Sequence, residues 1–432
     1  MHNYLICDTF SYNSFHTIHN AGVIFLSRNK IIVQKFGGTS VANAERLLNV
    51  AKTIISAHNT GYHVVVVASA QGGMTDSLLK KAHEVNPNAN KREMDMLLCT
   101  GEQQSVALLA MAINSLGHSA VSLNAAQIRI DSSKLHGNAQ IENIQTERIL
   151  KELERNNIVI VAGFQGINNN NDFTTLGRGA SDTTAVALAA VLNAEVCEIY
   201  TDVDGVFTVD PRLVQTAKLL PSIGFDTMLE LATSGAKVLH GRAAEMAKRY
   251  KVPLHVRSSL KNMPGTWIKE DGDVEQLSVS GIAIDRNVGR VSVMGLSDRP
   301  SVVFDIFSVL AKEKISVDII LQSVGKRRDI SFTVHSQDIE KTLEILEENR
   351  QKIGYIVLDA DKHLAKLSLV GAGMSTNFGV ASTMFEALYE CGINIKMIST
   401  SEIKIAVLVD ERDVAKAANA VHDKFDNVFK AI

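Results

Sequence analysis

The chain has 432 residues, of which 46% are hydrophobic, and 44 Lys+Arg against 47 Asp+Glu give a formal net charge of -3. This length predicts two to four domains with packed cores, and the balanced charge without a basic block argues against a nucleic-acid partner. No apolar run approaches the ~18 residues that span a bilayer, so we expect no membrane segment. The four cysteines fit neither a metal nor a redox spacing, which predicts a cytoplasmic protein.

Residues 1–29 form an unusual start, because Met1–Asn20 contains His2, His16 and His19 but no Lys or Arg. The segment lacks the basic start and the long apolar stretch of a secretory signal. We expect a poorly ordered N-terminal extension, unless translation begins near Lys30. A metal site built from the three histidines is the less favoured alternative.

From Lys30 to residue 262, short apolar runs alternate with helical patterns. The predicted strands are Lys30–Phe36, Tyr62–Ala68, Ile158–Gly163 and Val196–Thr201. The predicted helices are Val41–His58, Thr75–Val85, Ser105–Leu116, Ile141–Arg155, Asp182–Leu192 and Thr227–Tyr250. This alternation predicts an α/β domain over residues 30–262, with a mainly parallel sheet flanked by helices.

After Pro264–Gly265 the pattern changes to an internal repeat of strand, helix and strand. The two copies are Val291–Ile320, with an apolar helix at Val303–Glu313, and Leu367–Ile398, with an apolar helix at Val380–Cys391. Each copy has the size of a ferredoxin-like α+β module. We expect two modules side by side, residues 280–362 and 363–432, and interpret them as ligand-sensing modules.

The segment Lys35–Ser40 lies where the first predicted strand ends and a helix begins. Ligands of open α/β sheets bind outside the carboxyl ends of the strands, where glycines let a phosphate approach the backbone and a helix N-terminus favours an anion. Lys35 adds a positive charge at this edge. Because the chain has no Walker pattern, an ordinary βα turn would explain the glycine pair about equally well.

Further loops at the same predicted edge carry matching chemistry. Ser69–Thr75 is rich in small residues and hydroxyls, and Gly177–Asp182 places Arg178 between two glycines. Arg178 is suited to bind a carboxylate through two hydrogen bonds, whereas Asp182 alone would be a helix cap. The acidic residues of Thr201–Phe207 are either turn formers or ligands for magnesium or ribose.

Together and in this order, these loops resemble the aspartokinase family within the amino acid kinase fold. The match rests on Lys35–Val41, Gly177–Thr183, Thr201–Phe207, Asp210–Arg212 and Ser234–His240, and it extends from about Lys30 to the C-terminus. The resemblance implies transfer of the ATP γ-phosphoryl group to the β-carboxylate of L-aspartate, giving 4-phospho-L-aspartate, with Mg²⁺ as cofactor. That reaction is the first step of lysine, threonine and methionine biosynthesis.

The resemblance also implies roles for individual residues. The implied catalytic residues are Lys35, Asp182 and Lys237. The implied aspartate contacts are Ser69, Thr75, Glu102, Phe164, Arg178, Gly179 and Ser181. The implied nucleotide contacts are Lys35, Phe36, Gly37, Gly38, Thr39, Thr201, Asp202, Phe207, Arg212, Lys237 and Val238. Glu102 would face the substrate ammonium and Arg178 the α-carboxylate, and no resident metal site is expected.

Two positions depart from the family pattern. Phe207 stands where many members have tyrosine, so a hydroxyl contact is absent while the ring can still stack on adenine. Gly241 replaces the proline that usually follows His240, which should loosen that turn. Because neither change removes a charge, we expect activity to persist.

The acceptor carboxylate has a pKa near ~4 and is ionised at neutral pH, so the reaction needs no general base. His240 is therefore interpreted as a structural residue. The difficulty is to bring two anions together, and catalysis must come from alignment and charge neutralisation.

The repeated tail resembles tandem ACT domains, which bind amino acids at interfaces in such kinases. The resemblance implies feedback inhibition by an end-product amino acid, with L-lysine as first choice and threonine as second. The candidate contacts are Leu296, Arg299, Val302, Val303, Ser316, Val317, Asp318, Ser323 and Val324. Without the resemblance, these residues would be a solvated loop with a turn-forming aspartate. Ile398–Ile403 resembles the family's interface strand, which implies a homodimer through the tails and leaves a dimer of dimers open.

Two other functions compete with this interpretation. One is a kinase for another acidic amino acid such as glutamate, which the Arg178 loop and the tandem tail argue against. The other is a catalytically silent sensor, which the joint presence of Lys35, Glu102, Arg178 and Lys237 argues against. The chain ends at Ile432, and we expect no fused dehydrogenase domain.

Overall fold

The structure is a computed structural model that describes residues 30–177, 179–236, 238–270, 278–323, 328–372, 374, 377 and 379–429. The predicted N-terminal extension, residues 1–29, and three predicted site residues, Arg178, Lys237 and Val324, lie outside the described residues.

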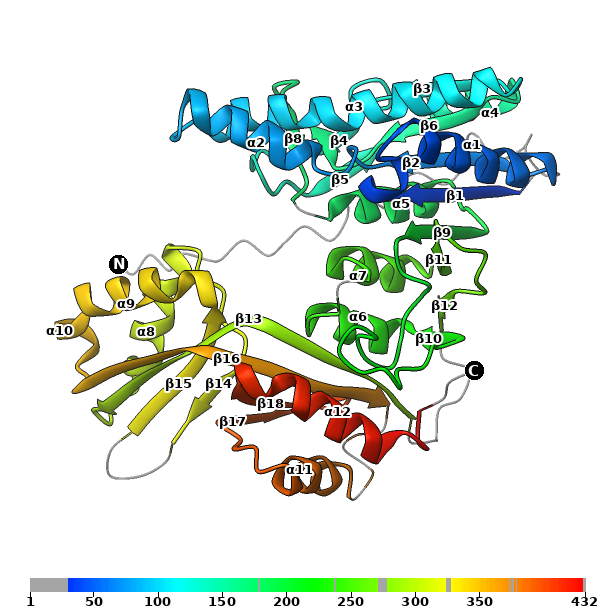
Figure 1. The fold of residues 1–432 in the computed structure, drawn as a ribbon. Coiled ribbons are helices and arrows are strands. Elements are labelled where there is room, and N and C mark those ends of the chain that lie inside the picture. Colours follow the sequence, from blue (N-terminus) through cyan, green and yellow to red (C-terminus); the bar gives the residue numbers. More distant parts are fainter. Residues whose placement is uncertain are drawn as a thin grey trace, which may run out of the picture.

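An eight-stranded sheet organises the first domain, with the strand order β10-β12-β11-β9-β1-β2-β6-β3 (Figure 1). Its strands are β1 (Ile31–Phe36), β2 (His63–Ala68), β3 (Ala120–Leu123), β6 (Ile158–Ala162), β9 (Val196–Thr201), β10 (Ser222–Gly224), β11 (Leu254–Ser258) and β12 (Thr266–Lys269). The β11–β12 pair is antiparallel, and the other pairs in this sheet are parallel. The prediction of a mainly parallel sheet is confirmed.

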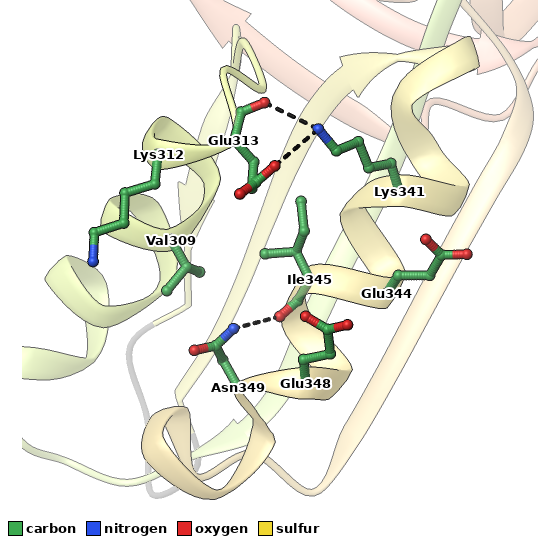
Figure 2. A pocket seen from close by; sticks show the side chains of 8 residues that line it. All are labelled: Val309, Lys312, Glu313, Lys341, Glu344, Ile345, Glu348 and Asn349. Carbon is green, nitrogen blue, oxygen red and sulfur yellow. Dashed lines mark hydrogen bonds and ion pairs between the residues drawn. The ribbon is translucent and has the colours of Figure 1, made fainter. Parts of the chain in front are cut away.

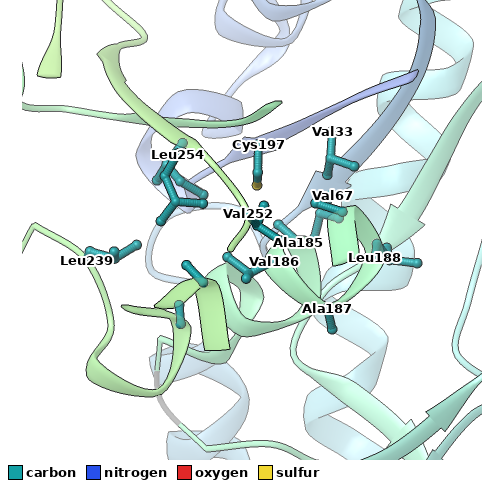
Figure 3. Close-up of a cluster of buried hydrophobic side chains, with 14 of the residues drawn as sticks. Val33, Val67, Ala185, Val186, Ala187, Leu188, Cys197, Leu239, Val252 and Leu254 are labelled. Atoms are coloured by element: carbon teal, nitrogen blue, oxygen red, sulfur yellow. The ribbon is translucent and has the colours of Figure 1, made fainter. Parts of the chain in front are cut away.

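Helices cover both faces of this sheet because its central strands are apolar on both sides. In β1, Ile31 and Val33 join one buried cluster, whereas Ile32 and Phe36 join another. Figure 3 shows part of the first cluster, where Val33 and side chains of α5 lie together. The helices are α1 (Ala44–Asn59), α2 (Met74–Val85), α3 (Lys91–Ser115), α4 (Glu147–Glu154), α5 (Ala180–Val191), α6 (Phe225–Thr233) and α7 (Gly241–Tyr250), preceded by the 3-10 turn η1 (Gly38–Val41).

A small sheet of four short strands lies beside α3 in the order β5-β4-β7-β8. Its strands are β4 (Ile130–Ser132), β5 (Ile141–Ile144), β7 (Gln165–Ile167) and β8 (Phe173–Thr175). The predicted helix Ile141–Arg155 is therefore wrong in its first part, because Ile141–Ile144 pairs with β4 and the helix begins only at Glu147.

Two other predicted helices differ in extent. Thr227–Tyr250 is not one helix but two, since residues 234–240 separate α6 from α7 and Gly235 has a φ of +116° that no helix adopts. Helix α3 begins at Lys91 instead of Ser105, because the Asn90 side chain caps it by accepting the Glu93 N–H. By length and composition α3 is long enough to cross a bilayer, but 50% of its apolar window is buried inside the domain, as in the core helix of a globular fold.

A six-stranded antiparallel sheet forms the tail, in the order β14-β15-β13-β16-β18-β17 (Figure 1). Its strands are β13 (Ser278–Leu296), β14 (Ile320–Gln322), β15 (Arg328–His335), β16 (Val357–Ala372), β17 (Met397–Thr400) and β18 (Lys404–Asp410). Its helices are α8 (Ser301–Lys312), α9 (Ile339–Glu348), α10 (Arg350–Ile353), α11 (Val380–Glu390) and α12 (Val414–Phe425), with the 3-10 turns η2 (Ser336–Asp338) and η3 (Glu411–Asp413).

The two repeat copies share the long central strands β13 and β16, which pair with each other along their length. In β16, Leu358 and Ala360 pack against the core of the first copy, whereas Ala365 and Leu367 belong to the core of the second. Because alternate residues of a strand point to opposite faces, the two cores lie on opposite sides of one sheet. The expected boundary between the two copies, residues 362 and 363, lies within β16, so one strand belongs to both copies.

Candidate active site

The carboxyl ends of β1, β2 and β9 lie together because these strands are parallel neighbours. The loops that follow them are joined by backbone hydrogen bonds. The Gly37 N–H donates to the Tyr200 carbonyl at 3.3 Å, and the Ser69 N–H donates to the Phe36 carbonyl at 3.1 Å. The predicted phosphate loop therefore lies beside both the hydroxyl-rich loop after β2 and the Thr201–Phe207 loop after β9.

The phosphate loop and the loop after β2 pack backbone against backbone at Gly38. A Cβ atom at Gly38 would lie 2.5 Å from the carbonyl oxygen of Ala70, and the Gly72 N–H donates to the Gly38 carbonyl at 3.0 Å. Only glycine fits such an approach. The close contact holds the glycine loop after β1 against the loop after β2, at the sheet edge where ligands of open α/β folds bind.

Lys35 and Asp182 form an ion pair at this rim. Lys35 precedes Phe36 in β1 and points to the face covered by α5, where its ammonium lies 2.7 Å from Asp182 Oδ1. The other carboxylate oxygen accepts the His240 backbone N–H at 3.2 Å. The first turn of α5 thus lies beside the phosphate loop, with a cation held between them.

Glu102 supplies a second charge at the rim, from the middle of α3. Its Oε1 accepts the Ala70 N–H at 3.1 Å, while its Oε2 is buried and has no hydrogen-bond partner among the described residues. Burial raises the pKa of the Glu102 carboxyl to about 7, and the Ala70 hydrogen bond offsets part of that shift. A buried carboxylate with one unpaired oxygen is suited to an incoming ammonium group.

The end of β6 packs on the first turn of α5 and brings other predicted aspartate contacts to the same place. A Cβ atom at Gly163 would lie 2.7 Å from the Ser181 hydroxyl, and Phe164 has a φ of +68°. The Phe164 N–H donates to the Thr184 hydroxyl at 3.2 Å. Thr75 lies half-buried in the first turn of α2, after the loop that begins at Ser69.

The loops that carry Arg178 and Lys237 contact each other through their described neighbours. Gly179 has a φ of +73°, and a Cβ atom there would lie 2.7 Å from Cδ2 of His240. His240 is interpreted as a structural residue: its ring lies against Gly179, and its backbone N–H donates to Asp182. The position of His240 immediately before α7 was the available sequence signal for this role, since a residue there directs its N–H outside the helix.

The predicted nucleotide contacts lie on the segment after β9 and on the turn after α6. Phe207 is half-buried and forms an isolated antiparallel bridge with Leu219. The Thr201 hydroxyl donates to Asp202 at 3.2 Å. Arg212 is exposed and bound to Asp210 at 2.8 Å, which raises the pKa of its guanidinium. Val238 is half-buried.

Two predicted effector contacts in the tail are already engaged inside the chain. The Arg299 guanidinium donates to the Ile353 carbonyl at 2.9 Å and lies 3.4 Å from Asp305. Asp318 is half exposed and pairs with the buried ammonium of Lys366, which comes from β16. The effector loop of the first copy is therefore tied to α10 and to the shared strand.

The other described effector candidates surround this loop. Leu296 and Val302 are buried, Val303 and Ser316 are exposed, and Val317 is half-buried. Ser323 forms a hydrogen-bonded pair with Asp329 at 2.9–3.0 Å, which fixes the end of β14.

A groove of about 370 Å³ opens between α8 and α9 in the first copy (Figure 2). It is lined by Val309, Lys312, Glu313, Lys341, Glu344, Ile345, Glu348 and Asn349. Lys341 and Glu313 form an ion pair at 3.1 Å across it. The groove contains none of the residues predicted for catalysis or effector binding.

The sequence matches two family models in the order that the fold suggests. Residues 30–258 match the amino acid kinase family, and residues 291–349 and 367–425 match an ACT domain. With the phosphate-type rim on the kinase sheet, these matches define a kinase, that is, a phosphotransferase, joined to tandem ACT domains.

Known proteins and structures narrow the class further. Aspartokinase from Bacillus sp. (strain MGA3) is 50% identical over 399 residues, which covers 92% of this chain and 97% of that protein. Aspartokinase 2 from Bacillus subtilis (strain 168) is 48% identical over 398 residues, with 92% and 98% covered. The chain belongs to the aspartokinase family, so the resemblance seen in its motifs is confirmed.

Two crystal structures of E. coli aspartokinase III share this fold. The complex with aspartate and ADP (R-state) has a TM-score of 0.80 at 26% identity, with 92% of this chain and 100% of that chain covered. The complex with lysine and aspartate (T-state) has a TM-score of 0.71 at 26% identity, with 92% and 99% covered.

Proposed function

We propose that the protein transfers the γ-phosphoryl group of ATP to the β-carboxylate of L-aspartate, giving ADP and 4-phospho-L-aspartate. This reaction would be the first step in the biosynthesis of lysine, threonine and methionine, and it would take place in the cytoplasm. The observation that carries the proposal is the arrangement of Lys35, Asp182 and Glu102 around one glycine-rich rim. The complex of E. coli aspartokinase III with aspartate and ADP supports it.

In the proposed step, a carboxylate oxygen of aspartate attacks the γ-phosphorus while the bond to the ADP oxygen breaks. No proton moves, because both the nucleophile and the leaving group are anions. Lys35 neutralises charge on the transferred group, and Asp182 holds the Lys35 ammonium in place. Lys237, between α6 and α7 in the sequence, would add a second positive charge. Mg²⁺, when bound with ATP, would neutralise the phosphates.

The residues at the rim fit such an ion without a dedicated protein cage. No group of three or more His, Cys, Asp or Glu side chains able to hold a metal occurs in the described part of the chain. Mg²⁺ in kinases is bound mainly by substrate phosphates, water and one or two carboxylates. Asp182, which pairs with Lys35, and Asp202, which follows β9, are the carboxylates that would hold such an ion.

The aspartate pocket would use opposite charges at its two ends. The unpaired Oε2 of Glu102 would accept the substrate ammonium, and Arg178 would bind the α-carboxylate. The remaining wall would consist of Ser69, Thr75, Phe164, Gly179 and Ser181. ATP would be bound by Phe36, Gly37, Gly38 and Thr39 on one side and by Thr201, Asp202, Phe207, Arg212 and Val238 on the other.

A hydroxamate assay tests this function directly. Hydroxylamine traps the acyl phosphate, so the purified protein is given ATP, Mg²⁺ and either L-aspartate or L-glutamate. We expect hydroxamate with aspartate and little with glutamate. Equal or greater turnover of glutamate would favour the alternative acceptor, and no ATP turnover with either amino acid would favour the silent sensor.

We further propose that the tail binds an end-product amino acid, with L-lysine ahead of L-threonine. The lysine complex of E. coli aspartokinase III supports this choice. Asp318 would bind the effector ammonium, beside Leu296, Arg299, Val302, Val303, Ser316, Val317, Ser323 and Val324. Inhibition follows if the effector binds an inactive arrangement more tightly than the active one. Inhibition curves with each amino acid test the choice.

We also propose that two copies of the chain form a homodimer through their tails. The edge strands β14 and β17 end the tail sheet, and exposed apolar side chains lie on them and on α8, including Phe304 at 71%, Ile320 at 50% and Ile398 at 39%. Such side chains on sheet edges are typical of interfaces. Light scattering would show a dimer, and a tetramer would indicate a dimer of dimers.

A further inference from the structure

The segment between β9 and β10, which carries the proposed nucleotide contacts, joins two hydrophobic cores. Val206 is buried in the core of the kinase sheet. Val209 and Val214, only a few residues later, are buried in the core of the second ACT module together with side chains of α12 and β16. The stretch from Phe207 to Arg212 is therefore held by the regulatory tail as well as by the kinase domain.

A buried histidine of the tail binds this segment at its centre. Nε2 of His422, on α12, lies 2.9 Å from the Thr208 hydroxyl, and Nδ1 lies 3.3 Å from the Thr216 hydroxyl. Both His422 and Thr208 are fully buried, and the ring stacks on Phe429 with centroids 4.8 Å apart. The two hydrogen bonds and the stacking fix the imidazole in one orientation.

The hydrogen-bond pattern accounts for a neutral ring. The Thr208 hydroxyl accepts the Lys218 N–H at 3.0 Å and can donate its own proton to Nε2 of His422. In that arrangement the neutral ring carries its proton on Nδ1 and donates it to the Thr216 hydroxyl. Burial lowers the pKa of His422, which agrees with an uncharged imidazole.

Another residue of α12 and the residue that caps its C-terminus bind the same segment. Asn419 donates to the Leu213 carbonyl at 3.1 Å, and Asp426 pairs with Lys218 at 2.8 Å. Positions 419, 422 and 426 are spaced by three and four residues, so they lie on one face of the helix. That face therefore contacts the segment on both sides of the isolated bridge between Phe207 and Leu219, at Thr208 and at Lys218.

We propose that His422 is a positioning residue for nucleotide binding. By holding Thr208 it fixes the adjacent Phe207 ring, and through Val209 it fixes Asp210 and Arg212, in the geometry that ATP needs. The proposal rests on the proposed function, because it takes this segment to be part of the ATP site. It assigns to the last helix of the regulatory tail a direct part in shaping the substrate site of the kinase domain.

The test separates the Michaelis constants of the two substrates. His422→Ala should raise the KM for ATP about tenfold, since a buried hydroxyl loses its partner and the segment is released, and should leave the KM for aspartate within about twofold. His422→Gln places an amide near the position of Nε2 and should restore much of the ATP affinity. Lys416→Ala, on an exposed part of α12 directed to α11, is the matched control and should change neither constant.

Two outcomes would overturn the proposal. One is an unchanged KM for ATP in folded His422→Ala, and the other is an equal rise in both constants, which a merely structural role would produce. If His422→Ala does not fold, Thr208→Val decides in the same way, because it removes the hydroxyl with little change in volume. Calorimetry measures the ADP affinity of every variant without relying on turnover. If the protein phosphorylates aspartate but its ADP affinity is the same in wild type and His422→Ala, this inference is disproved and the proposed function is not.

Discussion

The ammonium of Lys35 lies 2.7 Å from the carboxylate of Asp182, and the two side chains are only 12% and 10% exposed. Taking both charges out of water costs several kcal/mol per ion, and the attraction between them offsets that cost only in part. A buried pair at the end of a strand is therefore a poor device for stability. Its position beside the glycine loop indicates a cation that is held ready for an anionic substrate.

The first prediction concerns that cation. Lys35→Ala should lower kcat by at least ~100-fold, as expected when a group that stabilises transition-state charge is removed. Lys30→Ala is the matched control, because Lys30 is the residue immediately before β1 and its ammonium pairs with Glu195 on the surface. Steady-state kinetics in the hydroxamate assay measure both. A folded Lys35→Ala protein with near-wild-type turnover would exclude the assignment.

The second prediction uses the raised pKa of Glu102, about 7 in the ligand-free protein. Only the ionised carboxylate attracts the substrate ammonium, and below pH 7 the ionised fraction falls about tenfold per pH unit. The KM for aspartate should therefore fall as the pH rises from 6 to 8. Glu102→Gln should raise that KM and remove its pH dependence. A wild-type KM that is flat over this range would contradict the role of Glu102.

The same variant gives an independent signal in stability. The pKa of Glu102 is higher in the folded chain than the ordinary value of 4.5, so the folded state binds the proton more tightly and its stability falls as the pH rises from about 4.5 to about 7. Glu102→Gln removes this loss. Its melting temperature at pH 8 should equal or exceed that of the wild type, while the difference should be much smaller at pH 5 and vanish below about pH 4. A lower melting temperature at pH 8 would show that the charged form is paired within the protein.

Hydrophobic patterns predicted the central strands of the kinase sheet because these strands are apolar on both faces and stand between clear turns. The extent of α3 and the break between α6 and α7 were not predictable in this way. The break depends on Gly235, whose missing Cβ would lie 2.5 Å from the Ile284 carbonyl of β13, a contact between distant parts of the chain. The sequence alone contains no local trace of such a contact.

In the candidate site, too, some features could be predicted from local sequence and others depend on tertiary contacts. Each glycine loop is weak evidence alone, and the family resemblance was needed to place Lys35 with Asp182. The attachment of the Phe207–Arg212 segment to α12 had no sequence signal, because His422 looks like one more polar residue on an amphipathic helix. Tertiary contacts between cores decide such features, and periodicity reports only which face of an element is buried.

The third prediction compares two glycines of the phosphate-loop contact. Gly38→Ala should lower kcat/KM by at least about tenfold, because its Cβ would lie 2.5 Å from the Ala70 carbonyl and must push the two loops apart. Gly72→Ala is the control, since the nearest atom to its Cβ lies at 3.5 Å, an ordinary contact. Equal kinetics for the two variants, with equal melting temperatures, would show that the loop spacing does not matter to the reaction.

The fourth prediction concerns Asp318, which the proposed effector must reach. Asp318→Asn should raise the half-inhibitory concentration of the effector at least about tenfold, because a charge-assisted bond to its ammonium is lost. Activity without effector should stay within about twofold of the wild type. Glu340→Gln, which removes an exposed carboxylate of the same repeat copy paired with Lys362, is the control and should leave inhibition unchanged. Unaltered inhibition in Asp318→Asn would place the effector elsewhere.

The fifth prediction follows from the partner that Asp318 already has. The Lys366 ammonium, with its side chain 5% exposed, occupies the Asp318 carboxylate from the shared strand β16, so an effector ammonium must compete with it. Lys366→Met keeps the apolar stem of the side chain and removes the competing charge, and it should lower the half-inhibitory concentration several-fold. Inhibition curves against both L-lysine and L-threonine measure the effect. If the half-inhibitory concentration rises instead, Lys366 transmits the effector signal to the second repeat copy and does not compete with the ligand.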